Sequence, residues 1–312
     1  MDVLIGIDIG GTQLRAAVYP NDGSRNAIVQ KRIPTRGKEP SIDRLLRLIA
    51  DILPPRDRLI GIAAAVPGPT DPSAGLVISC PNIPGWEALP LRKLLHERFN
   101  APAAIGNDAN LAALGEWRFG AARGHHYVLY FTFSTGIGGG VIMNDELLLG
   151  SRGLAAELGH VTICVDGPIC SCGKQGHLEA VASGTGIANY VKAQLAAGRS
   201  SSLPKDPAPT AKDVSKAALQ GDELAVEAMQ RAGRFAGIAL ANYLHIFNPT
   251  IIIMGGGVSS SGEIFLGPVR KSMEENVISK EYLNNLTLTT AQLGDDAGLL
   301  GALALAGTLV RD

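Results

Sequence analysis

Apolar runs of strand length alternate along the chain with segments of helical periodicity. The apolar runs span residues 3–8, 14–19, 59–66, 103–106, 128–133 and 250–254, and each runs into glycine or proline within a few residues. Apolar residues spaced three and four apart mark the predicted helices at residues 41–52, 91–99, 109–119, 211–218, 224–247 and 298–309. Ser41 precedes the apolar positions of the first helix and is its expected N-cap. This alternation predicts an α/β fold.

The pattern at the amino terminus recurs in the middle of the chain. A strand from Val3, a glycine-rich turn, a second strand and a turn at residues 21–22 are matched by a strand from Val128, glycines, a second strand and a turn at residues 144–145. Two copies of one unit predict duplicated halves. The alternative is two unrelated hairpins in an α/β protein, and the pattern alone leaves both open.

Charge and composition narrow the function classes. The 312 residues contain 28 Lys and Arg against 29 Asp and Glu with no basic run, which argues against a nucleic-acid binder. The amino terminus lacks a basic segment, no apolar run has the length of a membrane span, and the 4 cysteines are too few for a disulfide scaffold. We therefore expect a soluble cytoplasmic protein that binds neither nucleic acid nor membranes.

Three of the apolar runs end in glycine-rich turns, at Asp8–Thr12, Ser134–Gly140 and Met254–Gly257. Glycine lets main-chain N–H groups approach an anion closely, and threonine hydroxyls add donors, so these turns favour a phosphate site over ordinary turns. The P-loop and dinucleotide spacings do not occur. Asp8 has two open roles, because it could cap its turn or hold Mg²⁺ through water.

A second cluster combines metal-binding side chains, namely His160, Cys170, Cys172 and His177. Two thiolates and two imidazoles suit tetrahedral Zn²⁺, although the spacing is not that of a zinc finger. The alternative is two buried cysteines and two incidental histidines. Glu157 and Glu179 flank the cluster and are either contacts for a hydroxylated ligand or solvated charges.

Asn107 and Asp108 stand where a short strand meets a helix. Asp108 could be a helix N-cap, or it could take the proton from an attacking hydroxyl while Asn107 orients the substrate. The motif alone favours the cap.

Together these motifs resemble the ROK (repressor, open reading frame, kinase) family of sugar kinases within the actin-like ATPase superfamily. The resemblance covers essentially the whole chain and rests on residues 8–12, 67–69, 106–110, 135–140, 157–160, 170–173, 176–179 and 255–257. It implies a two-lobed, ribonuclease H-like fold with duplicated mixed sheets and flanking helices. The expected small lobe is residues 1–118 with 298–312, and the large lobe is residues 119–297 with a zinc loop at about 160–177.

The resemblance also implies a reaction, the transfer of the γ-phosphate of ATP to the 6-hydroxyl of glucose, with Asp108 as catalytic base. The implied sugar contacts are Gly68, Asn107, Asp108, Glu157, His160 and Glu179. The implied contacts with ATP and Mg²⁺ are Asp8, Gly10, Gly11, Thr12, Thr135, Gly136, Gly255, Gly256 and Gly257. The implied zinc ligands are His160, Cys170, Cys172 and His177, with His160 also turned toward the sugar.

Several alternatives remain within this resemblance. His177 stands where the family pattern has cysteine, so the zinc site is either retained, as we expect, or weakened or lost. Fructose, mannose, N-acetylglucosamine and N-acetylmannosamine kinases share the frame, and a non-catalytic sugar sensor is a further possibility. A repressor would need a DNA-binding segment ahead of the first strand, for which we expect no room. The resemblance implies a homodimer or homotetramer.

Overall fold

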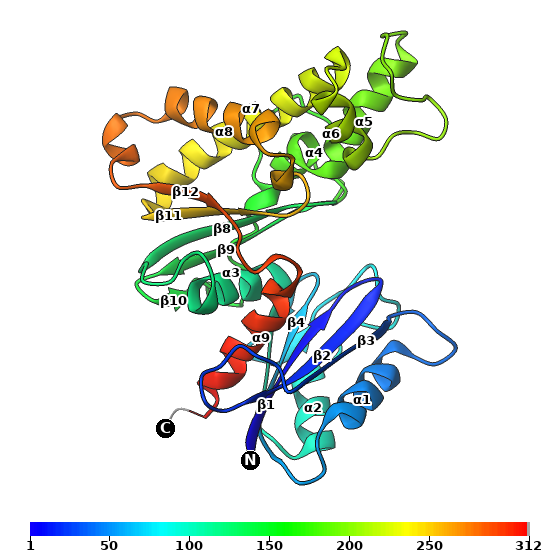
Figure 1. The fold of residues 1–312 in the computed structure, drawn as a ribbon, viewed down its shortest axis with the longest axis vertical. Coiled ribbons are helices and arrows are strands. Elements are labelled where there is room, and N and C mark those ends of the chain that lie inside the picture. Colours follow the sequence, from blue (N-terminus) through cyan, green and yellow to red (C-terminus); the bar gives the residue numbers. More distant parts are fainter. Residues whose placement is uncertain (311–312) are drawn as a thin grey trace.

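The computed structural model of the chain describes residues 1–310, which form two lobes, each built on a five-stranded sheet (Figure 1). The strands of the first sheet are β1 (Asp2–Ile9), β2 (Gln13–Pro20), β3 (Val29–Pro34), β4 (Arg58–Val66) and β7 (Ala103–Asn107). Those of the second are β8 (Tyr127–Phe133), β9 (Ile137–Met143), β10 (Glu146–Leu147), β11 (Ile251–Gly255) and β12 (Thr287–Thr290). A small separate hairpin joins β5 (Thr70–Asp71) to β6 (Leu76–Val77).

The two sheets have one topology. Their strand orders are β3-β2-β1-β4-β7 and β10-β9-β8-β11-β12. In each sheet the first three strands run antiparallel, and the last two run parallel to the strand that starts the unit. The repeated order and directions confirm the duplication that the sequence predicts.

Helices form three layers around the two sheets (Figure 1). The outer face of the first sheet carries α1 (Ser41–Ile52) and α2 (Leu91–Phe99). The outer face of the second carries α4 (Leu178–Ala182), α5 (Gly184–Ala196), α6 (Ala211–Leu219), α7 (Glu223–Phe247) and α8 (Glu263–Asn276). Between the sheets lie α3 (Asp108–Phe119), which packs on β8 and β9, and α9 (Ala297–Thr308), which packs on β1 and β4.

The two central helices contact each other through glycine. A Cβ on Gly301 would lie 1.7 Å from the Leu111 carbonyl oxygen, and one on Gly115 would lie 2.6 Å from that of Ala297. Larger side chains would therefore force α3 and α9 apart. The small residues of the last helix allow the close packing expected from its sequence.

The helix start at residue 41 differs from the prediction. Pro40 occupies the N-cap position of α1 without a side-chain cap, so Ser41 is the first helical residue and not its cap. The Ser41 hydroxyl instead accepts a hydrogen bond from Nε1 of the buried Trp86 at 2.7 Å.

Among residues 1–310, no helix combines the length and apolar character that crossing a membrane requires.

Candidate active site

The site forms where the carboxyl ends of parallel strands meet. Asp8 near the end of β1, Gly68 after β4 and Asn107 at the end of β7 share one edge of the first sheet. The turn at residues 134–136 after β8 and Gly257 after β11 share the corresponding edge of the second sheet. Crevices at such edges are the usual ligand sites of α/β sheets.

A pocket of about 480 Å³ joins the two edges, and we refer to it as the acceptor pocket. It brings together all six residues expected to contact the sugar, which are Gly68, Asn107, Asp108, Glu157, His160 and Glu179. The turn at residues 134–136 forms another part of its wall. Side chains from four separate parts of the chain therefore converge on one space.

Asn107, and not Asp108, caps the helix. Its side-chain oxygen accepts hydrogen bonds from the N–H groups of Ala109 at 3.0 Å and Asn110 at 3.1 Å, and Nδ2 donates to the Gly68 carbonyl at 3.2 Å. The expectation that the motif favours Asp108 as a cap is thus wrong, because Asp108 is already the first residue of α3. This leaves the Asp108 carboxylate facing the acceptor pocket.

The surroundings of Asp108 make it a stronger base than an ordinary aspartate. Burial raises its pKa to about 6, and the negative charges of Asp8 and Glu157 add to the increase, while the Ala109 N–H opposes it. A carboxylate of this pKa is ionised at neutral pH and binds a proton more readily than a solvated aspartate. It therefore suits general base catalysis.

Glu179 links the acceptor pocket to the cysteine-containing loop. Its carboxylate accepts hydrogen bonds from the Ser171 hydroxyl at 2.6 Å, the Ile137 N–H at 3.0 Å and the Cys170 thiol at 3.3 Å. Burial raises its pKa, but these donors outweigh burial, so the pKa of Glu179 is lowered. Glu179 is consequently an anionic acceptor with a fixed orientation.

The four residues predicted as zinc ligands lie together. One ligand atom from each of His160, Cys170, Cys172 and His177 lies within 4.8 Å of the others. The Cys170 sulfur is 3.7 Å from Nδ1 of His160, whose Nε2 is 3.9 Å from Glu157 on the pocket side. The Cys172 sulfur is 3.3 Å from Nδ1 of His177. Two sulfurs and two imidazole nitrogens at these separations fit a tetrahedral Zn²⁺.

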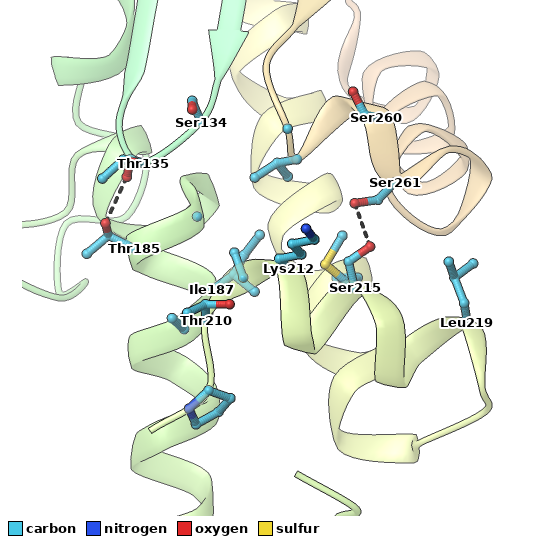
Figure 2. Close-up of a pocket in the computed structure, with 17 residues that line it drawn as sticks. Ser134, Thr135, Thr185, Ile187, Thr210, Lys212, Ser215, Leu219, Ser260 and Ser261 are labelled. Atoms are coloured by element: carbon cyan, nitrogen blue, oxygen red, sulfur yellow. Dashed lines mark hydrogen bonds between the residues drawn. The ribbon is translucent and has the colours of Figure 1, made fainter. Parts of the chain in front are cut away.

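A second pocket of about 680 Å³ lies beside the first and is shown in Figure 2. Ile187, Met229 and Val258 give it an apolar wall, and Lys212 contributes a positive charge. Ser134 and Thr135 line both pockets. A ligand held in the second pocket can therefore extend through the turn at residues 134–136 into the acceptor pocket.

The glycine turns divide into two kinds. Gly136 lines the acceptor pocket and Gly257 lines the second pocket. Gly255 and Gly256 line neither, because they pack against β8, where a Cβ on Gly256 would lie 2.3 Å from the Phe133 carbonyl oxygen. Close strand packing therefore accounts for glycine at these two positions, and their expected contact with ATP remains a prediction. The pocket residues Thr185, Lys212 and Ser215 were missed from the sequence because they lie on helices without a recognisable motif.

The first glycine-rich turn belongs to the first sheet, whereas the other two follow strands of the second sheet. Asp8, Gly10, Gly11 and Thr12 are absent from the walls of both pockets; Asp8 lies in β1, and the other three form the turn between β1 and β2. Nε of Arg15 donates to the Asp8 carboxylate at 3.1 Å. Burial raises the pKa of Asp8, and Arg15 counteracts part of that increase.

Comparisons with known proteins agree with this geometry. The sequence profile of the ROK family matches residues 4–308. The glucokinase of Thermotoga maritima is 37% identical over 308 residues, or 97% of this chain and 96% of that protein. The crystal structure of a ROK family glucokinase from Streptomyces griseus in complex with glucose and AMPPNP matches with a TM-score of 0.78 at 35% identity, covering 98% of this chain and 99% of that one. A ROK family transcriptional regulator matches with a TM-score of 0.87 at 27% identity, covering 99% of this chain and 78% of that one.

Proposed function

The chain belongs to the ROK family, and on that premise we propose that it transfers the γ-phosphoryl group of ATP to the 6-hydroxyl of glucose. Glucose is the acceptor because the T. maritima relative and the S. griseus structure are both glucokinases. One observation carries the reaction type. Asp108, with its raised pKa, faces an acceptor pocket that shares Ser134 and Thr135 with the second pocket.

In the proposed mechanism the second pocket holds the nucleotide and the acceptor pocket holds the sugar. Asp108 accepts the proton of the 6-hydroxyl as that oxygen bonds to the γ-phosphorus. The bond from the γ-phosphorus to the bridging oxygen breaks, which releases ADP and leaves glucose 6-phosphate. Glu157, Glu179 and His160 hold the other sugar hydroxyls through hydrogen bonds, so that the reacting oxygen points toward the phosphate.

Two metal ions accompany this proposal. Mg²⁺ bound with ATP would neutralise charge on the phosphate oxygens, and Asp8, a carboxylate near the end of β1, would hold it through water. We assign structural Zn²⁺ to His160, Cys170, Cys172 and His177, whose donor set and separations fit that ion. The zinc loop would then fix Ser171, which donates to Glu179 in the sugar site.

The test is ADP release with Mg²⁺ and ATP, measured against glucose, mannose, fructose, N-acetylglucosamine and N-acetylmannosamine. We expect preference for glucose, loss of turnover in Asp108→Asn, and normal turnover in Asp51→Asn, an exposed control on α1. Preference for another sugar would correct the acceptor alone. No turnover with any sugar would favour a non-catalytic sensor, and full turnover in Asp108→Asn would exclude the proposed base.

Three further expectations from the sequence remain predictions. They are the lobe division near residues 118 and 297, a homodimer or homotetramer, and a cytoplasmic location. Sedimentation of the purified protein would determine the oligomeric state.

A further inference from the structure

A groove of about 710 Å³ lies at the junction between the lobes, away from the two pockets described above. Its lining includes Arg25, Arg118, Arg123, His125, His126 and Gln292, and we call it the hinge groove. Both chain crossings between the lobes contribute to it. Residues 120–126 lead from α3 to β8, and Gln292 lies between β12 and α9.

The hinge groove is remote from the acceptor pocket. Asp145, in the β9–β10 turn, lines the hinge groove, whereas Gly136 at the other end of β9 lines the acceptor pocket. A strand of this length separates its two ends by about 20 Å. In the first sheet, Arg25 likewise follows β2, whose opposite end starts at the glycine turn. A ligand in the groove would therefore contact neither proposed substrate.

Positive charge is concentrated and unbalanced in the hinge groove. Among residues 1–310, the guanidinium groups of Arg118 and Arg123 have no hydrogen-bond or ion-pair partner, and that of Arg25 donates to the Phe119 carbonyl at 3.1 Å. One carboxylate faces the groove, that of Asp145, and it is 2.7 Å from Nδ1 of His126. The chain as a whole has a net charge of −1, so the groove is clearly more positive than the rest of the molecule.

We propose that the hinge groove binds a small anion with two or more phosphoryl groups, at a site separate from the nucleotide. Guanidinium groups match the geometry of phosphate oxygens and form charge-assisted pairs with them. Three guanidiniums around one polar groove repel each other, and a multivalent anion would remove that repulsion. The groove volume lies in the range typical of small-molecule sites.

Binding at this position would affect the relative orientation of the lobes. Arg25 belongs to the first lobe, His126 leads into the second, and Arg123 lies on the crossing between them. An anion that contacts all three favours one angle between the lobes over others. By linkage, the anion and the proposed glucose substrate should then change each other's affinity.

Trp117 provides a direct readout of binding. It is one of 2 tryptophans, it lines the groove, and its Nε1 donates to the His125 carbonyl at 2.8 Å. The experiment titrates the full chain, with saturating ADP in the nucleotide pocket and no added Mg²⁺, while tryptophan emission is recorded. One arm uses inorganic tripolyphosphate and the other fructose 1,6-bisphosphate, which separates inorganic from sugar phosphates. Fructose serves as the uncharged comparison.

We expect a saturable emission change with at least one of the two anions and none with fructose. The double variant Arg118→Gln, Arg123→Gln should bind that anion at least tenfold more weakly. The matched control Arg56→Gln, an exposed arginine in the α1–β4 turn, should bind it as the wild type does. Equal affinity in the double variant and wild type, or no saturable change with either anion, would overturn the proposal. This binding measurement does not depend on kinase activity, so it is independent of the proposed function.

A kinetic measurement then tests the coupling. In the proposed glucose assay, the anion identified above should change the KM for glucose at least twofold in the wild type and leave it unchanged in the double variant. Without the anion, both proteins should have the same kcat because the groove lies far from the cleft. An equal effect of the anion on both proteins would contradict coupling through the groove.

Discussion

The carboxylate of Glu116 accepts a hydrogen bond from the main-chain N–H of Leu293, 177 positions later in the chain, at 2.8 Å. Its second oxygen accepts one from the N–H of Ala121, also at 2.8 Å. Ala121 lies on the first crossing between the lobes and Leu293 on the second, and Glu116 itself is fully buried. A single side chain on α3 therefore joins both crossings.

Replacing this carboxylate should destabilise the protein. Glu116→Gln turns an NH₂ group toward one of the two main-chain donors, which then lacks an acceptor in a buried position. We expect the free energy of unfolding, measured by urea denaturation, to fall by about 2 kcal/mol. Glu274→Gln, at an exposed position of α8, should change it by less than about 0.5 kcal/mol. Equal stability of the two variants would show that the shared acceptor contributes little.

The pKa of Asp108 predicts how turnover depends on pH. Because Asp108 must be ionised to accept a proton, and burial raises its pKa to about 6, kcat/KM should be constant above that pH. Below it, kcat/KM should fall about tenfold per pH unit. Asp108→Asn should lower kcat by about 100-fold or more, without the same pH dependence. A wild-type profile that stays flat to pH 4 would contradict the assignment.

The same residue predicts a gain in stability on substitution. The pKa of Asp108 lies above its ordinary value of 3.8 in the folded state, so its ionisation costs folding free energy as pH rises from 4 through 6. Asparagine carries no charge, and Asp108→Asn should therefore be more stable above pH 6, by up to about 3 kcal/mol. The gain should vanish below about pH 4. Urea denaturation at pH 4 and pH 8 measures both, and a variant less stable than wild type at pH 8 would contradict this reasoning.

The sequence predicted the repeated architecture well because apolar strands and glycine turns leave local signals. The second copy starting at Val128 corresponds to the second sheet, and six helices were expected where helices occur. Several elements without such signals were not predicted, among them β3, α5 and α8. Strand β3 is exposed along most of its length, and α8 contains Pro268, which interrupts its periodicity.

Contacts between segments that are far apart in the chain could not be predicted from the sequence. Gly138 and Gly140 resemble part of a phosphate turn, yet they lie in β9, where a Cβ would lie 2.8 and 2.5 Å from Ala109 and Ala113 of α3. Because these glycines have no side chain, α3 can pack closely against β9. Arg25 and Arg118 are far apart in sequence and share a groove only because the lobes meet there. The residues of the proposed sugar site could be named from the sequence because each lies in a local motif, and the structure brings them to one pocket.

The cysteine loop predicts a metal content. We expect about one Zn²⁺ per chain by elemental analysis, retained in Cys164→Ser and lost in Cys172→Ser, because Cys164 lies outside the four-residue set. Loss of zinc should free Ser171 and Glu179 from their present positions and raise the KM for glucose more than kcat falls. Zinc-free wild-type protein with an unchanged KM would show that His177 does not maintain a functional metal site.

The hydrogen bond from Arg15 to Asp8 predicts how tightly the enzyme holds Mg²⁺ with ATP. The Arg15 guanidinium donates to Asp8 at 3.1 Å and to Asp296, which precedes α9, at 3.2 Å, so it orients the Asp8 carboxylate and opposes the rise in its pKa that burial causes. Arg15→Gln removes this charge, the pKa of Asp8 rises further, and Asp8 is less often ionised. We expect the Mg²⁺ concentration for half-maximal rate to rise about tenfold, with the KM for glucose unchanged.

The matched control for Arg15 is Arg58, because their aspartate partners, Asp8 and Asp2, lie at opposite ends of β1. Arg58 pairs with Asp2 at 2.6 Å at the start of β1, in an exposed position. Arg58→Gln removes an arginine–aspartate pair of similar composition without touching the cleft, so its Mg²⁺ dependence should match that of the wild type. Equal shifts in both variants would mean that β1 as a whole has been disturbed. A shift confined to Arg15→Gln, larger at pH 6 than at pH 8, would assign the effect to the ionisation of Asp8.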